Sequence, residues 1–120
     1  MIGWIKLHRG IKDHWIFADA EKFRAWVYIL LTVNFESAPV SIKGNKFICN
    51  RGESLKSLDT WAREFGRNWN KNKVDRFFQA LKKAEMITIK NEKKTTRLTV
   101  INYEKYQNNE PENRTQTEIN

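Results

Sequence analysis

The apolar residues of the chain recur in separate periodic segments, and each segment predicts one element of secondary structure. Helical spacing of apolar residues predicts a short helix over residues 7–13 and a longer helix that follows Asp19. Asp19 suits the start of the longer helix because its carboxylate can accept hydrogen bonds from free backbone amides of the first turn. We expect this helix to be central, with one apolar face formed by Phe23, Trp26, Val27, Leu30 and Leu31.

Shorter apolar segments in the middle of the chain predict β-strands. Residues 40–42 and 46–49 flank Gly44 and Asn45, and glycine tolerates the positive φ of a two-residue hairpin turn. The sequence therefore predicts a small β-hairpin whose turn is formed by these two residues. A further short strand is expected over residues 53–56.

Two helices with clear end signals follow in the second half of the chain. Ser57 can cap a helix that ends at Gly66, and Asn70 can cap the next helix. Trp69 and Val74 have the spacing of a hydrophobic staple across the first turn of that next helix. The predicted buried faces consist of Leu58, Trp61, Ala62 and Phe65 in the first helix and of Val74, Phe77, Phe78 and Leu81 in the second.

Two segments rich in β-branched residues complete the pattern. Residues 86–90 and 96–102 flank the charged loop 91–95, and we expect them to pair as an antiparallel hairpin. The order helix, short strands, helix, turn, helix, strand, loop and strand predicts an α+β fold. This order of elements is the order found in a winged helix-turn-helix domain, here with an additional N-terminal helix and small β-hairpins. We expect this domain to span residues 1–106 and residues 107–120 to form a flexible polar tail or linker.

The charge of the chain adds an expectation about its partner. The 120 residues carry 22 lysines and arginines against 14 aspartates and glutamates, which gives a formal net charge of +8. The basic excess lies within the predicted domain, because residues 107–120 contain one basic and three acidic residues. A basic domain of this kind favours nucleic acid as the partner.

The helix that follows Asn70 carries side chains suited to reading DNA. At about 100° per residue, a stripe of amides and cations falls opposite its buried residues. The stripe and its shoulder consist of Asn72, Lys73, Arg76, Gln79 and Lys83. Amide side chains can pair bidentately with adenine, and arginine with guanine, in a major groove that admits a helix. Asp75 lies beside the stripe and would repel phosphate, so the expected contact is asymmetric.

Further basic residues flank this helix in the sequence. Lys93, Lys94 and Arg97 lie in or beside the predicted wing, where a basic hairpin can meet the DNA backbone or the minor groove. Arg67 and Lys71, at the turn before the helix, are candidates for clamping phosphate together with the backbone amides of the helix N-terminus. Double-stranded DNA is therefore the expected partner, and ordinary surface charge is the alternative for each of these residues.

Aromatic residues offer a different nucleic-acid hypothesis, in which exposed rings stack on single-stranded bases. Trp26, Trp61 and Trp69 stand at predicted core positions, so we expect them to pack inside the domain instead. Tyr103 and Tyr106 follow the last strand, and we expect them to pack on the domain or to cover a self-association surface.

Other classes of function find little support in the sequence. The longest apolar run, residues 25–31, is far shorter than the roughly 20 residues that cross a bilayer, and no secretory signal is visible. We therefore expect a cytoplasmic protein without a membrane partner. Cys49 is the single cysteine and is expected to be a buried structural thiol, while His8 and His14 lack the spacing of metal ligands. No cofactor, metal or enzymatic activity is expected.

Four short segments carry a resemblance to a known family. They are GWIKLHR at 3–9, RGESLKSL at 51–58, KVDRFFQALKK at 73–83 and INYEKYQ at 101–107. Together they resemble the N-terminal winged-helix domains of phage replication initiation proteins, in the replisome-organiser, DnaD-like group. The resemblance implies binding of origin or operator DNA, often by an oligomer, and a linker to a second domain that contacts helicase-loading proteins.

The chain departs from that pattern because its tail stops at Asn120, which leaves no room for a second domain. It is then either an excised N-terminal domain or a short stand-alone relative. We expect sequence-specific double-stranded DNA binding in the replication initiation of a phage or mobile element. Transcriptional regulation fits the same chemistry, and an adaptor that docks other replication proteins is an alternative of a different class. A homodimer through the N-terminal helix or the C-terminal tyrosines is a further expectation.

Overall fold

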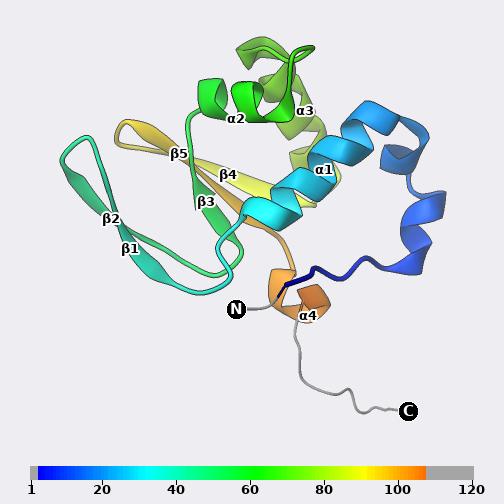
Figure 1. Ribbon diagram of the computed structural model, residues 1–120, viewed down its shortest axis with the longest axis horizontal. Coiled ribbons are helices and arrows are strands. Elements are labelled where there is room, and N and C mark those ends of the chain that lie inside the picture. The colour runs from blue at the N-terminus through cyan, green and yellow to red at the C-terminus, as the bar shows by residue number, and fades with distance from the viewer. Residues whose placement is uncertain (1–2, 108–120) are drawn as a thin grey trace.

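The helices and the sheet share one hydrophobic core in the computed structural model, which describes residues 3–107 (Figure 1). The helical elements are η1 Arg9–Asp13, η2 Trp15–Ala18, α1 Ala20–Thr32, α2 Leu58–Phe65, α3 Lys71–Lys83 and α4 Tyr103–Gln107. The strands are β1 Ala38–Ile42, β2 Asn45–Cys49, β3 Glu53–Leu55, β4 Ile87–Glu92 and β5 Thr95–Val100. The protein is therefore a mixed α+β structure, and the α+β class predicted from the sequence is confirmed.

The strands form two separate antiparallel sheets. The larger sheet has the order β3-β5-β4, so that β5 lies in the middle, with Leu98 opposite both Ser54 and Ile89. Strands β1 and β2 form a hairpin of their own, which pairs Ala38 with Cys49 at its base. Both the hairpin over 38–49 and the hairpin over 87–100 were expected from the sequence, and both are confirmed.

Polar caps define where the three main helices begin, as predicted. Asp19 Oδ1 accepts hydrogen bonds from Glu21 N and Lys22 N, Ser57 Oγ accepts one from Thr60 N, and Asn70 Oδ1 accepts one from Lys73 N. Gly66 follows α2 with φ +127° and ψ −175°, a positive φ that glycine adopts without a steric penalty. The short segment between α2 and α3 is therefore bounded by a glycine and by a cap.

An aromatic cluster holds α2 and α3 together. The rings of Trp61 and Phe65 contact Phe78, and Phe65 lies 4.8 Å from Trp69 between ring centroids. Trp69 also contacts Phe77 on α3, at 5.5 Å. Trp26, Trp61 and Trp69 are all buried, as predicted, so none of them presents a ring for base stacking. The buried residues of α3 are the four expected, namely Val74, Phe77, Phe78 and Leu81.

The N-terminal segment and the face of α1 differ from prediction. Within residues 7–13 only Arg9–Asp13 is helical, as the 3₁₀ helix η1, and a second 3₁₀ helix, η2, follows it. The Nδ1 atoms of His8 and His14 accept hydrogen bonds from Gly10 N and Ile16 N at the starts of these two helices. On α1, Ile29 is fully buried and Leu31 is 62% exposed. Because α1 is apolar around most of its circumference, tertiary packing rather than periodicity selects the buried side.

The turns of the two hairpins also differ from prediction. The first hairpin turns at Lys43 and Gly44, because Asn45 already pairs with Ile42 in the ladder. The second hairpin turns tightly at residues 93–94 rather than through a five-residue loop, since Glu92 pairs with Thr95. Strands β2, β4 and β5 therefore extend further towards their turns than the composition of the loops suggests.

Residue Gln107 belongs to the folded part and not to the predicted tail. Its side chain is buried and forms two hydrogen bonds with the backbone of Lys6, accepting from Lys6 N at 2.7 Å and donating to Lys6 O at 2.8 Å. Tyr103 is buried as expected, and Tyr106 is 48% exposed. Residues 108–120 of the predicted tail lie outside the described residues.

Candidate nucleic-acid interface

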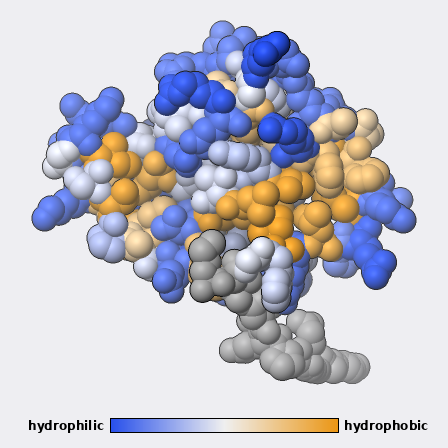
Figure 2. Space-filling view, in the orientation of Figure 1, coloured by the Kyte–Doolittle hydropathy of each residue, from blue (hydrophilic) through white to orange (hydrophobic). Residues whose placement is uncertain are grey.

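The outward face of α3 presents the side chains that the sequence singles out. The opposite face of this helix is fixed by its buried residues, of which Phe78 packs against Trp61 and Phe65 of α2. The exposed residues of the predicted stripe are Asn72, Arg76, Gln79 and Lys83. Figure 2 shows hydrophilic residues covering the end of the molecule where α2 and α3 lie. The helix thus offers amides and cations to a partner in one continuous stripe.

Lys73 does not belong to this stripe. Its ammonium forms an ion pair with Glu21 on α1, with Nζ 2.5 Å from Oε1, and donates a hydrogen bond to Asn68 O at 3.2 Å. The same group lies 4.5 Å from the centre of the Trp69 ring. From its shoulder position Lys73 therefore points towards α1, and its charge is paired there and not presented with the predicted contact residues.

A cation that the sequence analysis did not select extends the basic face of α3. Lys82 is exposed, and it lines a small cavity of about 200 Å³ between α3 and the β4–β5 hairpin. Asp75, Gln79 and Asn91 line the same cavity. On the exposed side of α3, four cations, Lys71, Arg76, Lys82 and Lys83, stand against the single carboxylate of Asp75. On the helical wheel Lys82 falls next to Asp75, on the exposed side of α3. This position is the sequence signal that could have identified Lys82 as part of the basic face.

The tip of the β4–β5 hairpin is basic and exposed, as predicted. Lys93 and Lys94 form its two-residue turn, and neither has an ion pair within residues 3–107. Lys94 has φ +66°, in the left-handed region that few lysines adopt. Both ammonium groups are thus free to meet a partner.

Arg97 is held inside the protein and does not belong to the predicted contact. Its Nε lies 2.6 Å from Glu92 Oε2, and its Nη1 bonds to Glu53 Oε1 and to Ile48 O. The hydrogen bond to Glu92 is the largest cause that raises the pKa of Arg97, and the same bond is the largest cause that lowers the pKa of Glu92. The side chain of Arg97 is only 18% exposed, so its charge serves the structure.

The segment that leads into α3 supplies two further exposed cations, as predicted. Arg67 lies in the turn after α2, and Lys71 is the first residue of α3. At this end of the helix the backbone amide of Lys73 has no partner within α3, and it donates a hydrogen bond to Asn70 Oδ1 at 2.8 Å. The side chains of Arg67 and Lys71, more than the amide of Lys73, can therefore contact an anion here.

The histidines and the single cysteine each have a local structural contact. His8 and His14 use Nδ1 to accept backbone hydrogen bonds, and within residues 3–107 no group of three histidine, cysteine or acidic side chains could hold a metal ion. Cys49 is buried, and desolvation raises the pKa of its thiol. None of the helices in the described part of the chain is long and apolar enough to span a membrane.

Comparison of the whole chain with protein-family models, with curated proteins and with solved structures gives no match.

Proposed function

We propose that the protein is a winged helix-turn-helix domain that binds double-stranded DNA, with α3 in the major groove and the β4–β5 hairpin as its wing. The element order from α1 to β5 supports this assignment, as does the sheet order β3-β5-β4. Three residues, 67–69, separate Gly66 at the end of α2 from Asn70, the cap of α3, and this is the length of the turn in such motifs.

The single observation that carries the proposal is the chemistry of the exposed side of α3. A solubilising surface helix usually mixes both signs of charge, whereas this one exposes four cations, two amides and one carboxylate. Arg76 can pair with guanine, and Asn72 and Gln79 with adenine, at the edges of the major groove. Arg67, Lys71, Lys93 and Lys94 would contact the flanking phosphates.

The biological process follows from the resemblance to phage replication initiators. We propose that the domain binds origin or operator DNA in the cytoplasm and performs no catalysis itself, and that two copies bind two half-sites. Transcriptional regulation would use the same surface. Light scattering with and without duplex would measure whether a dimer forms.

A protein-docking role has one specific observation in its favour. A cavity of about 890 Å³ opens between the N-terminal segment and α4, and Trp26, Tyr103 and Tyr106 line it. Trp4 is also 69% exposed. An adaptor would use such an apolar surface, and the basic side of α3 would then be incidental.

Fluorescence anisotropy with a labelled duplex at several salt concentrations tests the proposal. If about five phosphates are neutralised, the logarithm of the binding constant should fall against the logarithm of salt with a slope of roughly −4 to −5. The variant Arg76→Ala/Lys83→Ala should lose most of this binding. Arg9→Ala/Lys12→Ala is a matched control, because it removes the same two residue types from exposed positions on η1.

Two outcomes would contradict the proposal. Absence of duplex binding at micromolar protein and low salt would exclude it, and so would equal losses in the α3 variant and the η1 control. Retained duplex binding by the α3 variant, together with loss of a protein partner, would favour the adaptor.

A further inference from the structure

The β1–β2 hairpin is an accessory element whose surface the proposed function does not use. It forms a sheet of its own, and of its ten strand residues only Cys49 is buried. Residues 38–49 contain two lysines, Lys43 and Lys46, and no carboxylate. Both lysines are exposed and have no ion pair among the described residues. The charges of the hairpin are therefore all positive, and it contributes little to the core.

The hairpin is fastened to the β3-β5-β4 sheet at a defined point. Arg97 Nη1 on β5 donates a hydrogen bond to Ile48 O on β2 at 2.9 Å, and the same guanidinium pairs with Glu53 on β3 and Glu92 on β4. Near the base of the hairpin, Asn34 Nδ2 donates to Cys49 O at 3.2 Å. Arg97 therefore fixes the position of the β1–β2 hairpin relative to the β4–β5 hairpin.

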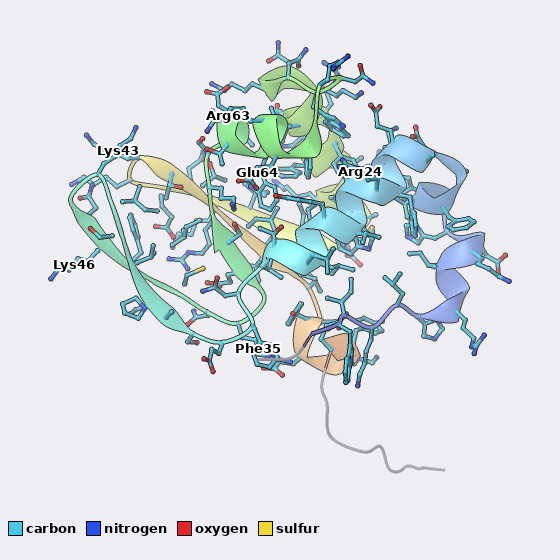
Figure 3. All side chains as sticks on the ribbon, viewed as in Figure 1. Arg24, Phe35, Lys43, Lys46, Arg63 and Glu64 are labelled. Atoms are coloured by element: carbon cyan, nitrogen blue, oxygen red, sulfur yellow. The ribbon has the colours of Figure 1, made fainter. Side chains whose placement is uncertain are left out.

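The tips of the two hairpins extend to the same side of the molecule. The Arg97–Ile48 contact lies three residues after Lys94 in β5 and four residues after Gly44 in β2, so it joins the two hairpins close to their tips. At about 3.3 Å per residue, the turn at Lys94 lies about 10 Å, and that at Gly44 about 13 Å, from this contact along the respective strand. Figure 1 shows both tips at the left end of the molecule, and in Figure 3 Lys43 and Lys46 point away from the body there.

Both turns place a lysine in an unfavourable backbone conformation. Lys43 has φ +50° and Lys94 has φ +66°, a region where asparagine and glycine are much more common. Because Gly44 follows with φ +82°, the first turn has the positive φ pair for which Asn-Gly is the favoured sequence. The turn geometry alone therefore does not favour a lysine at position 43.

We propose that the β1–β2 hairpin is a second DNA-contacting prong, in which Lys43 and Lys46 bind the phosphodiester backbone of the duplex beside the contact made by Lys93 and Lys94. This inference rests on the proposed function. The contact is to phosphate and not to base edges, so it strengthens binding to every sequence alike and lengthens the stretch of duplex that the domain covers. The expected ligand is a DNA duplex that is longer than the duplex covered by α3 and the β4–β5 hairpin alone.

The variant Lys43→Asn/Lys46→Gln tests the second prong without weakening the turn. Asparagine at position 43 creates the favoured Asn-Gly turn, so the thermal unfolding midpoint should stay equal or rise. Loss of two phosphate contacts should make the salt slope of duplex binding less steep by about 2. Between about 50 and 200 mM salt, the affinity ratio of wild type to variant should then shrink roughly tenfold. The size of the effect should be the same on a preferred and on an unrelated duplex.

The control Lys12→Asn/Lys105→Gln makes the same substitutions at exposed lysines on η1 and α4. A hairpin variant that matches this control in both affinity and salt slope overturns the second prong, while Arg76→Ala/Lys83→Ala still reports on α3. If wild type binds duplex and the hairpin variant keeps the full salt slope, the proposed function stands and this inference fails. If wild type binds no duplex, the proposed function itself has failed.

Discussion

Lys73 on α3 and Glu21 on α1 form an ion pair that joins the outward-facing helix to the first helix of the core. Nζ lies 2.5 Å from Oε1, and the stem of Lys73 brings the same ammonium over the Trp69 ring. The lysine thereby connects α1, the segment before α3, and α3 itself. The charge of Lys73 is paired within the protein, whereas Arg76 and Lys83 on the same helix are exposed.

We expect Lys73→Met to lower the free energy of unfolding without changing the salt dependence of DNA binding. The loss should be about 0.5–1 kcal/mol, because the two side chains are 28% and 36% exposed and solvent screens the pair. Urea denaturation measures the stability, and anisotropy at several salt concentrations measures the slope. Glu21→Gln should give a similar loss of stability. A slope less steep by about one unit in Lys73→Met would show that this lysine contacts phosphate after all.

Two asparagines near the start of α3 should have opposite roles. Asn70 Oδ1 accepts a hydrogen bond from Lys73 N at 2.8 Å, so Asn70→Ala should cost about 1 kcal/mol of stability. Asn72 is exposed two residues later, and Asn72→Ala should leave the urea midpoint unchanged while lowering affinity for a preferred duplex. Equal stability losses in both variants would contradict this division.

The parts of the structure that sequence reasoning predicted are those determined by neighbours in the chain. The caps at Asp19, Ser57 and Asn70 each require only a polar side chain two or three residues before a backbone amide. The buried face of α3 follows from one clear apolar stripe, because the rest of the helix is polar. The same local logic places Arg67, Lys71 and the exposed stripe of α3 correctly at the surface.

The misassigned residues depend on partners that come together only in the fold. The carboxylate that pairs with Lys73 is 52 residues away, and Arg97 is held by Glu53, 44 residues away, and by Glu92 on the neighbouring strand of its own hairpin. A basic residue looks the same in sequence whether it faces solvent or a carboxylate, so periodicity could not distinguish these two from Lys83 or Lys94. The choice between Ile29 and Leu31 on α1 has the same origin.

Removing the guanidinium of Arg97 should loosen both hairpins together. Arg97→Met leaves Glu53 and Glu92 close to each other without the intervening charge, and it deletes the hydrogen bond to Ile48 O. We expect a loss of about 1–2 kcal/mol from these charged hydrogen bonds. Amide hydrogen exchange should also become faster in β2. Lys93→Met is a suitable control at an exposed position. Unchanged exchange in β2 would show that Arg97 does not fasten the β1–β2 hairpin.

The thiol of Cys49 should report on opening of the same region. The residue is 5% exposed, Sγ donates a hydrogen bond to Glu53 O at 3.4 Å, and desolvation with the nearby Glu53 charge raises its pKa. A buried thiol of raised pKa is a poor nucleophile. Reaction with a disulfide reagent should therefore be slow in the native protein and fast in urea. Rapid reaction of the native protein would mean that the hairpin base opens far more often than the rest of the fold.

Acid should destabilise the protein through Glu64 and Glu92. Burial by itself raises the pKa of Glu64, but hydrogen bonds from Lys56 and from the hydroxyl of Tyr28 outweigh it, and the pKa is lowered. The hydrogen bond from Arg97 is the main cause that lowers the pKa of Glu92. As pH falls, the unfolded chain takes up protons at these positions before the native protein does. Their contribution to stability is thus complete above the ordinary glutamate pKa of about 4.3 and disappears as pH falls through the lowered native values.

Urea denaturation between about pH 6 and pH 3 measures this loss. Glu64→Gln should lower the urea midpoint at the upper end of this range, where the wild-type carboxylate is charged and bonded to Lys56 at 3.0 Å. The same variant should depend less on pH, because one of the two proton-linked groups is gone. Glu36→Gln is the matched control, since Glu36 is exposed and has no ion pair in the described part of the chain. A pH dependence in Glu64→Gln as steep as that of wild type would assign the acid sensitivity to other carboxylates.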